Sequence, residues 1–138
     1  MIERYAKTRG ERLFHASGGE SLMLHDSARG HFPVYLSVRG SSPDVVTLRA
    51  HWSRCARTER IRLHEYVNHF NEHDALLTAS VCESHGTSAL EIVAKSRFWV
   101  RDDDDFRPFV RFVDRSLAAA ARLFEAIYTD QASHSIAA

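Results

Sequence analysis

The sequence has little of what marks several classes of protein. It contains two cysteines, Cys55 and Cys82, which are too few for a disulfide framework or a four-cysteine zinc site, so we expect reduced thiols. No apolar run approaches the roughly 20 residues that a membrane-spanning helix requires. The N-terminal stretch MIERYAKTRGERLFHASGG lacks the apolar segment of a signal peptide. These absences predict a cytoplasmic protein that does not bind a membrane.

An excess of basic charge and the common catalytic motifs are also absent. Lys and Arg number 18, and Asp and Glu also number 18, which argues against a protein that binds duplex DNA, because such proteins usually carry a basic face. We expect no nucleic-acid partner. The chain has neither a Gly-x-x-x-x-Gly-Lys-Ser/Thr nor a Gly-x-Gly-x-x-Gly phosphate-binding loop, and it has no Gly-x-Ser-x-Gly nucleophile elbow. The sequence therefore predicts a protein that is not an enzyme and uses no cofactor.

Alternation of apolar and polar residues predicts two β-hairpins. Residues 32–39 and 45–52 alternate with a period of two, and a Gly-Ser-Ser-Pro-Asp turn lies between them. A second pair of predicted strands, Leu76–Glu83 and Thr87–Arg101, flanks Ser84-His85-Gly86. In the last of these strands, Trp99 lies on the charged side rather than the apolar side.

The first 30 residues are weakly patterned. We expect two short strands there, Arg12–His15 and Ser21–His25, and we expect the first ten residues to be loosely held.

Two amphipathic helices are predicted. The first runs from about Glu59 to His73 after a cap at Thr58, with Leu63, Tyr66, Val67 and Phe70 in one apolar stripe. The second runs from about Asp104 to Tyr128 and has one continuous apolar face. The acidic run Asp102–Asp105 suits its N-terminus, where the helix dipole favours negative charge. The tail 131–138, QASHSIAA, is expected to be disordered.

The order of these elements predicts an α+β fold. Strands that are adjacent in sequence and joined by short turns form antiparallel sheets, and the two amphipathic helices need a sheet face to cover their apolar sides. We therefore expect a twisted antiparallel sheet with helices packed on one face. The chain would form a single domain over 1–130.

The segment HFNEH carries the one pattern that suggests a metal site. His69, Glu72 and His73 have the His-x-x-Glu-His spacing of inverted zincins, in which two histidines one helical turn apart hold zinc. On a helix the two histidines lie 40° apart, so both could reach one ion. Against this interpretation, His73 falls in the last turn, where a histidine commonly complements the helix dipole. We treat the three residues as weak candidates for a metal site.

The same helix carries an asparagine pair, Val67-Asn68-His69-Phe70-Asn71. Together with "FPVYLSVRG", "VVTLRAHWSR" and the elements that follow, it resembles the bacterial YbjN-like domain over about residues 30–128. The resemblance implies a fold like that of type III secretion chaperones, often dimeric, with a leading helix before the first strand. It also implies a structural role for Asn68 and Asn71, whose amides would tie the helix to a neighbouring loop.

The resemblance implies no catalytic residues, because YbjN-like proteins are described as regulators of sensory transduction or as chaperone-like. The first hypothesis is therefore a non-enzymatic domain that binds an unidentified protein and forms a homodimer. The alternative is a small-molecule or metal-binding domain that uses His69, Glu72 and His73. A third hypothesis, nucleic-acid binding, has only one local basic cluster to support it: Arg54, Arg57, Arg60 and Arg62.

Overall fold

The structure, a computed structural model, describes residues 1–28, 30–40, 44–55, 60–74, 76–83 and 89–137. The strands are β1 (Phe14–His15), β2 (Ser21–Ser27), β3 (Gly30–Arg39), β4 (Asp44–Cys55), β5 (Thr78–Glu83) and β6 (Leu90–Val100). The helices are α1 (Ile2–Arg9), α2 (Arg60–His73) and α3 (Phe106–Ala137), with short 3-10 turns η1 (Ser17–Gly19) and η3 (Asp103–Asp105). The predicted cap at Thr58 and the turn at Ser84–Gly86 lie outside the described residues.

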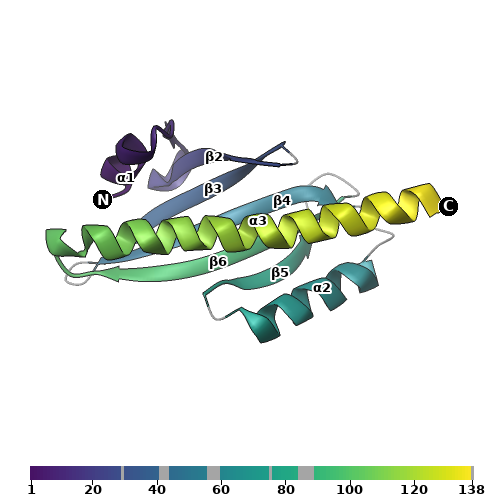
Figure 1. Cartoon of the computed structure of the whole chain (residues 1–138). Coiled ribbons are helices and arrows are strands. Elements are labelled where there is room, and N and C mark those ends of the chain that lie inside the picture. Colours follow the sequence, from purple (N-terminus) through teal and green to yellow (C-terminus); the bar gives the residue numbers. More distant parts are fainter. Residues whose placement is uncertain (29, 41–43, 56–59, 75, 84–88, 138) are drawn as a thin grey trace.

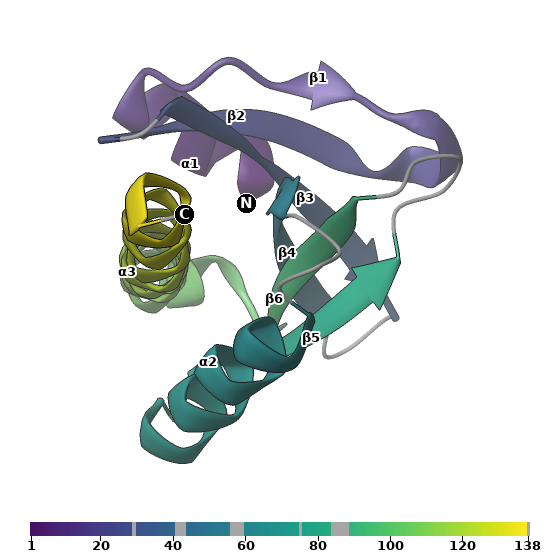
Figure 2. The same cartoon turned by 90° about the vertical axis from the view of Figure 1, so that its right-hand side faces the viewer.

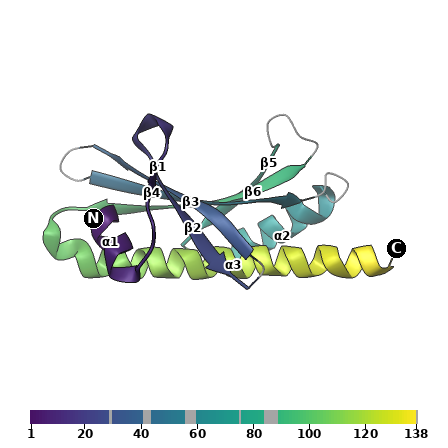
Figure 3. The same cartoon turned by 90° about the horizontal axis from the view of Figure 1, so that it is seen from above.

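All six described strands form one antiparallel sheet in the order β1-β2-β3-β4-β6-β5. The helices lie on one side of it, and α3 crosses its whole length (Figures 1 and 3). The sheet curves around α3, with α1 and α2 near its two ends (Figure 2). This arrangement confirms the predicted α+β fold with helices on one face.

The period-two pattern fixes which side chains enter the core. Between β3 and β4, Val34 pairs with Ala50 and Leu36 pairs with Leu48. Between β4 and β6, Val46 pairs with Phe98. Alternate residues of three strands are therefore buried under the helices, namely Phe32, Val34, Leu36, Val46, Leu48, Ala50, Trp52, Leu90, Ile92 and Ala94. The intervening residues point to the opposite face.

Helix α3 supplies the other half of the core. Phe124 stacks on Trp52, with ring centroids 5.5 Å apart and planes 19° apart, and meets Phe32 edge-on at 5.0 Å. Asp102 caps the turn η3, because its side chain accepts a hydrogen bond from the Asp104 N–H. The acidic run thus forms the turn η3 directly before α3, and the α-helix itself starts two residues later than predicted.

The expectation that the first ten residues are loosely held is wrong. They form α1, whose Ile2, Tyr5 and Ala6 are buried in the core. The Tyr5 hydroxyl donates a 2.7 Å hydrogen bond to Asp114 of α3, and Arg9 pairs with the same carboxylate. So short a helix is marginal in isolation and draws its stability from tertiary contacts that its sequence does not reveal.

The C-terminal end also differs from the prediction. Helix α3 continues past Tyr128 to Ala137, through the segment 131–137 that was expected to be a disordered tail. No glycine or proline follows Pro108 in the sequence, so no residue stops the helix once it has formed.

Strand β5 begins at Thr78 rather than Leu76. The Asp74 carboxylate accepts hydrogen bonds from the backbone N–H groups of Leu76 and Leu77, and this turn holds both residues out of the sheet.

Candidate functional site

Helix α2 brings the three candidate metal ligands together. The ligand atoms of His69, Glu72 and His73 all lie within 4.8 Å of one another, and all three side chains are exposed. The centroids of the His69 and His73 rings are 4.3 Å apart. The Nδ1 of His73 lies 2.8 Å from the His69 carbonyl oxygen and donates to it, the contact that a histidine in a last helical turn commonly makes. His73 therefore has a structural role at the C-terminus of α2.

Asn71 joins α2 to the edge of the sheet. Its Nδ2 donates to the Ala79 carbonyl oxygen at 2.9 Å, and its Oδ1 accepts from the Ala79 N–H at 2.8 Å. Strand β5 is the last strand of the sheet, so the amide of Asn71 pairs with edge groups that face away from β6. The partner is thus a strand rather than the predicted loop. Asn68 is exposed one turn earlier and makes no such contact.

A groove runs between α2 and α3. It consists of two adjoining hollows of about 330 Å³ each, and Tyr66 and His69 line both. In the hollow between the helices, the lining combines apolar with polar residues: Tyr66, Phe70, Leu123 and Ala126 with His69, His73, Asp74 and Arg122. The sequence placed Tyr66 and Phe70 on the core side of α2, but both are only half-buried.

An ion pair joins α2 to α3 beside the first of these hollows, which Arg62 lines. Arg62 Nε donates to Asp130 Oδ2 at 2.6 Å, and its terminal nitrogen donates to Oδ1 at 3.0 Å. Burial and the nearby Asp130 carboxylate raise the pKa of Tyr66. The arrangement fixes α2 against α3 beside the hollow.

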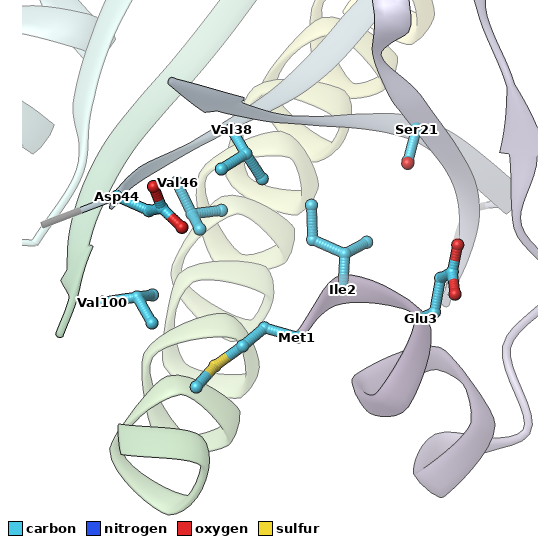
Figure 4. A pocket seen from close by; sticks show the side chains of 8 residues that line it. All are labelled: Met1, Ile2, Glu3, Ser21, Val38, Asp44, Val46 and Val100. Atoms are coloured by element: carbon cyan, nitrogen blue, oxygen red, sulfur yellow. The ribbon is translucent and has the colours of Figure 1, made fainter. Parts of the chain in front are cut away.

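A smaller hollow of about 280 Å³ lies where α1 meets the ends of β3, β4 and β6 (Figure 4). Apolar side chains Met1, Ile2, Val38 and Val100 point into it, and the carboxylates of Glu3 and Asp44 lie at its rim. The Val38 side chain is 51 % exposed there. The two charged side chains among the lining residues, Glu3 and Asp44, are both acidic.

The sheet face opposite the helices carries a larger hollow of about 440 Å³. Its lining comes from β3, β4, β6 and the segment before β2, and comprises Glu20, Ser37, Arg39, Val45, Thr47, Arg49, Lys95, Arg97 and Trp99. We call this sheet surface the open face, because no described helix covers it (Figures 2 and 3). Trp99 is 56 % exposed at this surface. Sequence analysis placed Trp99 on the charged side of its strand, but it did not reveal which strands lie beside it.

The arginine group proposed from sequence, Arg54, Arg57, Arg60 and Arg62, is described only in part. Arg57 and the side chain of Arg54 lie outside the described residues, whereas Arg60 pairs with Glu83 at 3.3 Å and Arg62 pairs with Asp130. Cys55 is buried and Cys82 is half-buried. Burial raises the pKa of the Cys55 thiol to about 11, with a further contribution from Glu91. Neither thiol lines a hollow described above.

Taken together, the described residues form a helix-covered antiparallel sheet with open hollows, and no helix among them is long and apolar enough to cross a membrane. No family model matches the sequence, and no curated protein matches it. Among solved structures, the chain is similar to the crystal structure of YbjN from E. coli, described as a "putative transcription regulator". The TM-score is 0.74 and the identity 12 %, over 94 % of this chain and 90 % of that one. The protein therefore has a YbjN-like fold, as predicted.

Proposed function

We propose that the chain is a non-enzymatic, regulatory or chaperone-like binding module that holds a segment of another protein in the groove between α2 and α3. The observation that carries the proposal is the lining of this groove: an apolar floor that includes Tyr66, Phe70 and Leu123, bordered by charged and polar groups. Protein interfaces have this anatomy, with a buried apolar anchor inside a polar rim. A helix or extended segment with one large apolar side chain would fit it.

Two further features support binding rather than catalysis. None of the hollows described above pairs a serine or cysteine with a histidine, the arrangement that activates a nucleophile. The similar fold, YbjN, is described as a regulator. The predicted homodimer and cytoplasmic location remain parts of this proposal, and a second copy of the chain is one partner that the groove could hold.

Site-specific photocrosslinking tests the proposal. A photoreactive phenylalanine analogue at Ala126, which is exposed and lines the groove, should form a covalent adduct with one protein in cells of the source organism. The matched control places the analogue at Ala118, an exposed alanine of the same helix that lines none of the hollows described above. An adduct at Ala126 with the mass of two chains would identify the homodimer. Equal crosslinking at both positions, or none at either, would contradict the proposal.

A further inference from the structure

The open face gathers basic side chains that lie far apart in the sequence. Arg39 comes from β3, Arg49 from β4, and Lys95 and Arg97 from β6. We call these four residues the basic cluster. One carboxylate, Glu20, lies among the residues that line the same hollow, and it pairs with Arg49 at 2.6 Å. Within the described part of the chain, the hollow therefore carries a clear excess of positive charge, although the whole sequence is neutral.

The strand register places these charges side by side. Arg49 lies directly opposite Lys95, and Thr47 lies opposite Arg97 in the next outward-facing row. Adjacent strands are about 4.8 Å apart and outward-facing residues of one strand are about 6.8 Å apart, so Arg49, Lys95 and Arg97 form one contiguous surface. Two like charges directly opposite each other destabilise a strand pair. The Glu20 carboxylate offsets this repulsion at Arg49, and a bound anion would do so at Lys95 and Arg97.

Aromatic side chains flank the cluster on the same face. Trp99 follows Arg97 by two residues and lies opposite Val45, which lines the same hollow. Tyr35 lies opposite Arg49 on its other side, with the guanidinium carbon 5.2 Å from the ring centre. The open face thus presents one exposed indole beside the cations, whereas the Tyr35 ring is half-buried and already meets the Arg49 guanidinium and, at 5.0 Å, the His51 ring.

We propose that the open face binds single-stranded nucleic acid. Surfaces that bind single strands without sequence preference combine cations that track the phosphates with aromatic rings on which bases stack. The basic cluster supplies the first element, and the exposed Trp99 supplies the second. An acidic peptide would satisfy the cations but would leave the exposed indole without a planar partner. A duplex fits less well, because its bases are stacked on one another and leave no free face for the exposed indole.

This proposal revises the expectation that no nucleic acid is bound. That expectation came from the net charge, which averages over the chain. The surface is also separate from the groove between α2 and α3, which lies on the helical side of the sheet (Figure 2). The two proposals therefore stand or fall independently.

The test is a titration of the full chain against a fluorescein-labelled oligouridylate of about 12 nucleotides, followed by anisotropy at several salt concentrations. The wild-type chain should bind, with affinity falling as salt rises. The variant Lys95→Glu/Arg97→Glu should lose more than about tenfold in affinity. Each phosphate contact adds about 0.7 to the salt slope, so this variant should lower the slope by about 1.4. The control, Arg107→Glu/Arg111→Glu, makes the same charge change at exposed positions of α3 and should bind as the wild type does.

The tryptophan gives a second, independent readout. Trp52 is 2 % exposed, so quenching of tryptophan emission by the oligonucleotide would come from Trp99. Trp99→Ala should weaken binding by at least about fivefold, and Trp99→Phe should retain most of the affinity, because stacking needs only an aromatic face. If the double charge reversal does not fold, as judged by circular dichroism, Arg97→Gln replaces it with an expected slope change of about 0.7.

Three results would overturn the proposal: no binding at low salt, equal binding of a duplex of the same length, or displacement by polyglutamate together with no effect of Trp99→Ala. The last result would assign the surface to acidic peptides instead.

Discussion

Replacing Asn71 with alanine tests the account of how the sheet ends. The substitution removes two hydrogen bonds, at 2.9 and 2.8 Å, from the backbone of Ala79, which is only 3 % exposed. Each such bond contributes about 0.5–1.5 kcal/mol net, so Asn71→Ala should lower the free energy of unfolding by about 1–3 kcal/mol. For a chain of this length the entropy of unfolding is about 0.3 kcal/mol/K, which converts the loss to a decrease in Tm of roughly 3–10 °C.

Asn68→Ala is the matched control for this prediction. Both asparagines are exposed on α2, and alanine is the better helix former by up to about 0.7 kcal/mol at either position. The difference between the two variants in urea denaturation therefore isolates the contacts with β5. Asn71→Asp, which keeps the acceptor but loses the donor, should fall between Asn71→Ala and the wild type. If Asn71→Ala and Asn68→Ala unfold within about 0.5 kcal/mol of each other, the amide does not stabilise the edge of the sheet.

Three further predictions follow from the core and its titratable groups. Burial and the hydrogen bond to Asp114 raise the pKa of Tyr5 above its ordinary value of 10.0, so the stability that this hydroxyl contributes is present below pH 10 and is lost as the pH rises further. Urea denaturation on either side of pH 10 should show a steeper alkaline loss of stability for the wild type than for Tyr5→Phe. Equal losses in the two proteins would contradict this prediction. In the native protein a thiol reagent should modify Cys82 quickly and Cys55 only on unfolding, since Cys55 is 2 % exposed and its pKa is raised to about 11; a test on Cys82→Ala that finds rapid modification would refute the burial. Phe124→Ala should cost about 3–5 kcal/mol by chemical denaturation, because it removes the ring that packs on Trp52, and a loss below about 1 kcal/mol would show that the core is not centred there.

The longer elements could be predicted from sequence because their patterns are local. Residues 32–39 and 45–52 alternate strictly, and this alternation alone decides which side chains face the helices. The apolar stripe of α2 predicted a helix that ends at His73, and α2 does end at His73. Helix α1 could not be predicted in the same way, since its eight residues are mostly polar and its stability comes from Tyr5 and Arg9 meeting Asp114, about a hundred residues away.

The candidate sites also differ in whether a local pattern could predict them. His69, Glu72 and His73 could be placed together from the sequence, because a helix brings positions three and four apart onto neighbouring directions. The groove needed the position of α3 relative to α2, which no local pattern contains.

Local patterns in the sequence predict the strands, the two longer helices and the face that each buries, because those depend on periods of two and 3.6 residues. That Arg39, Arg49, Lys95, Arg97 and Trp99 share one surface is instead a consequence of how the strands pair in the sheet. Strand β6 pairs with β4 although α2 and β5 lie between them in the sequence, and Arg49 lies opposite Lys95 only because of that non-local pairing.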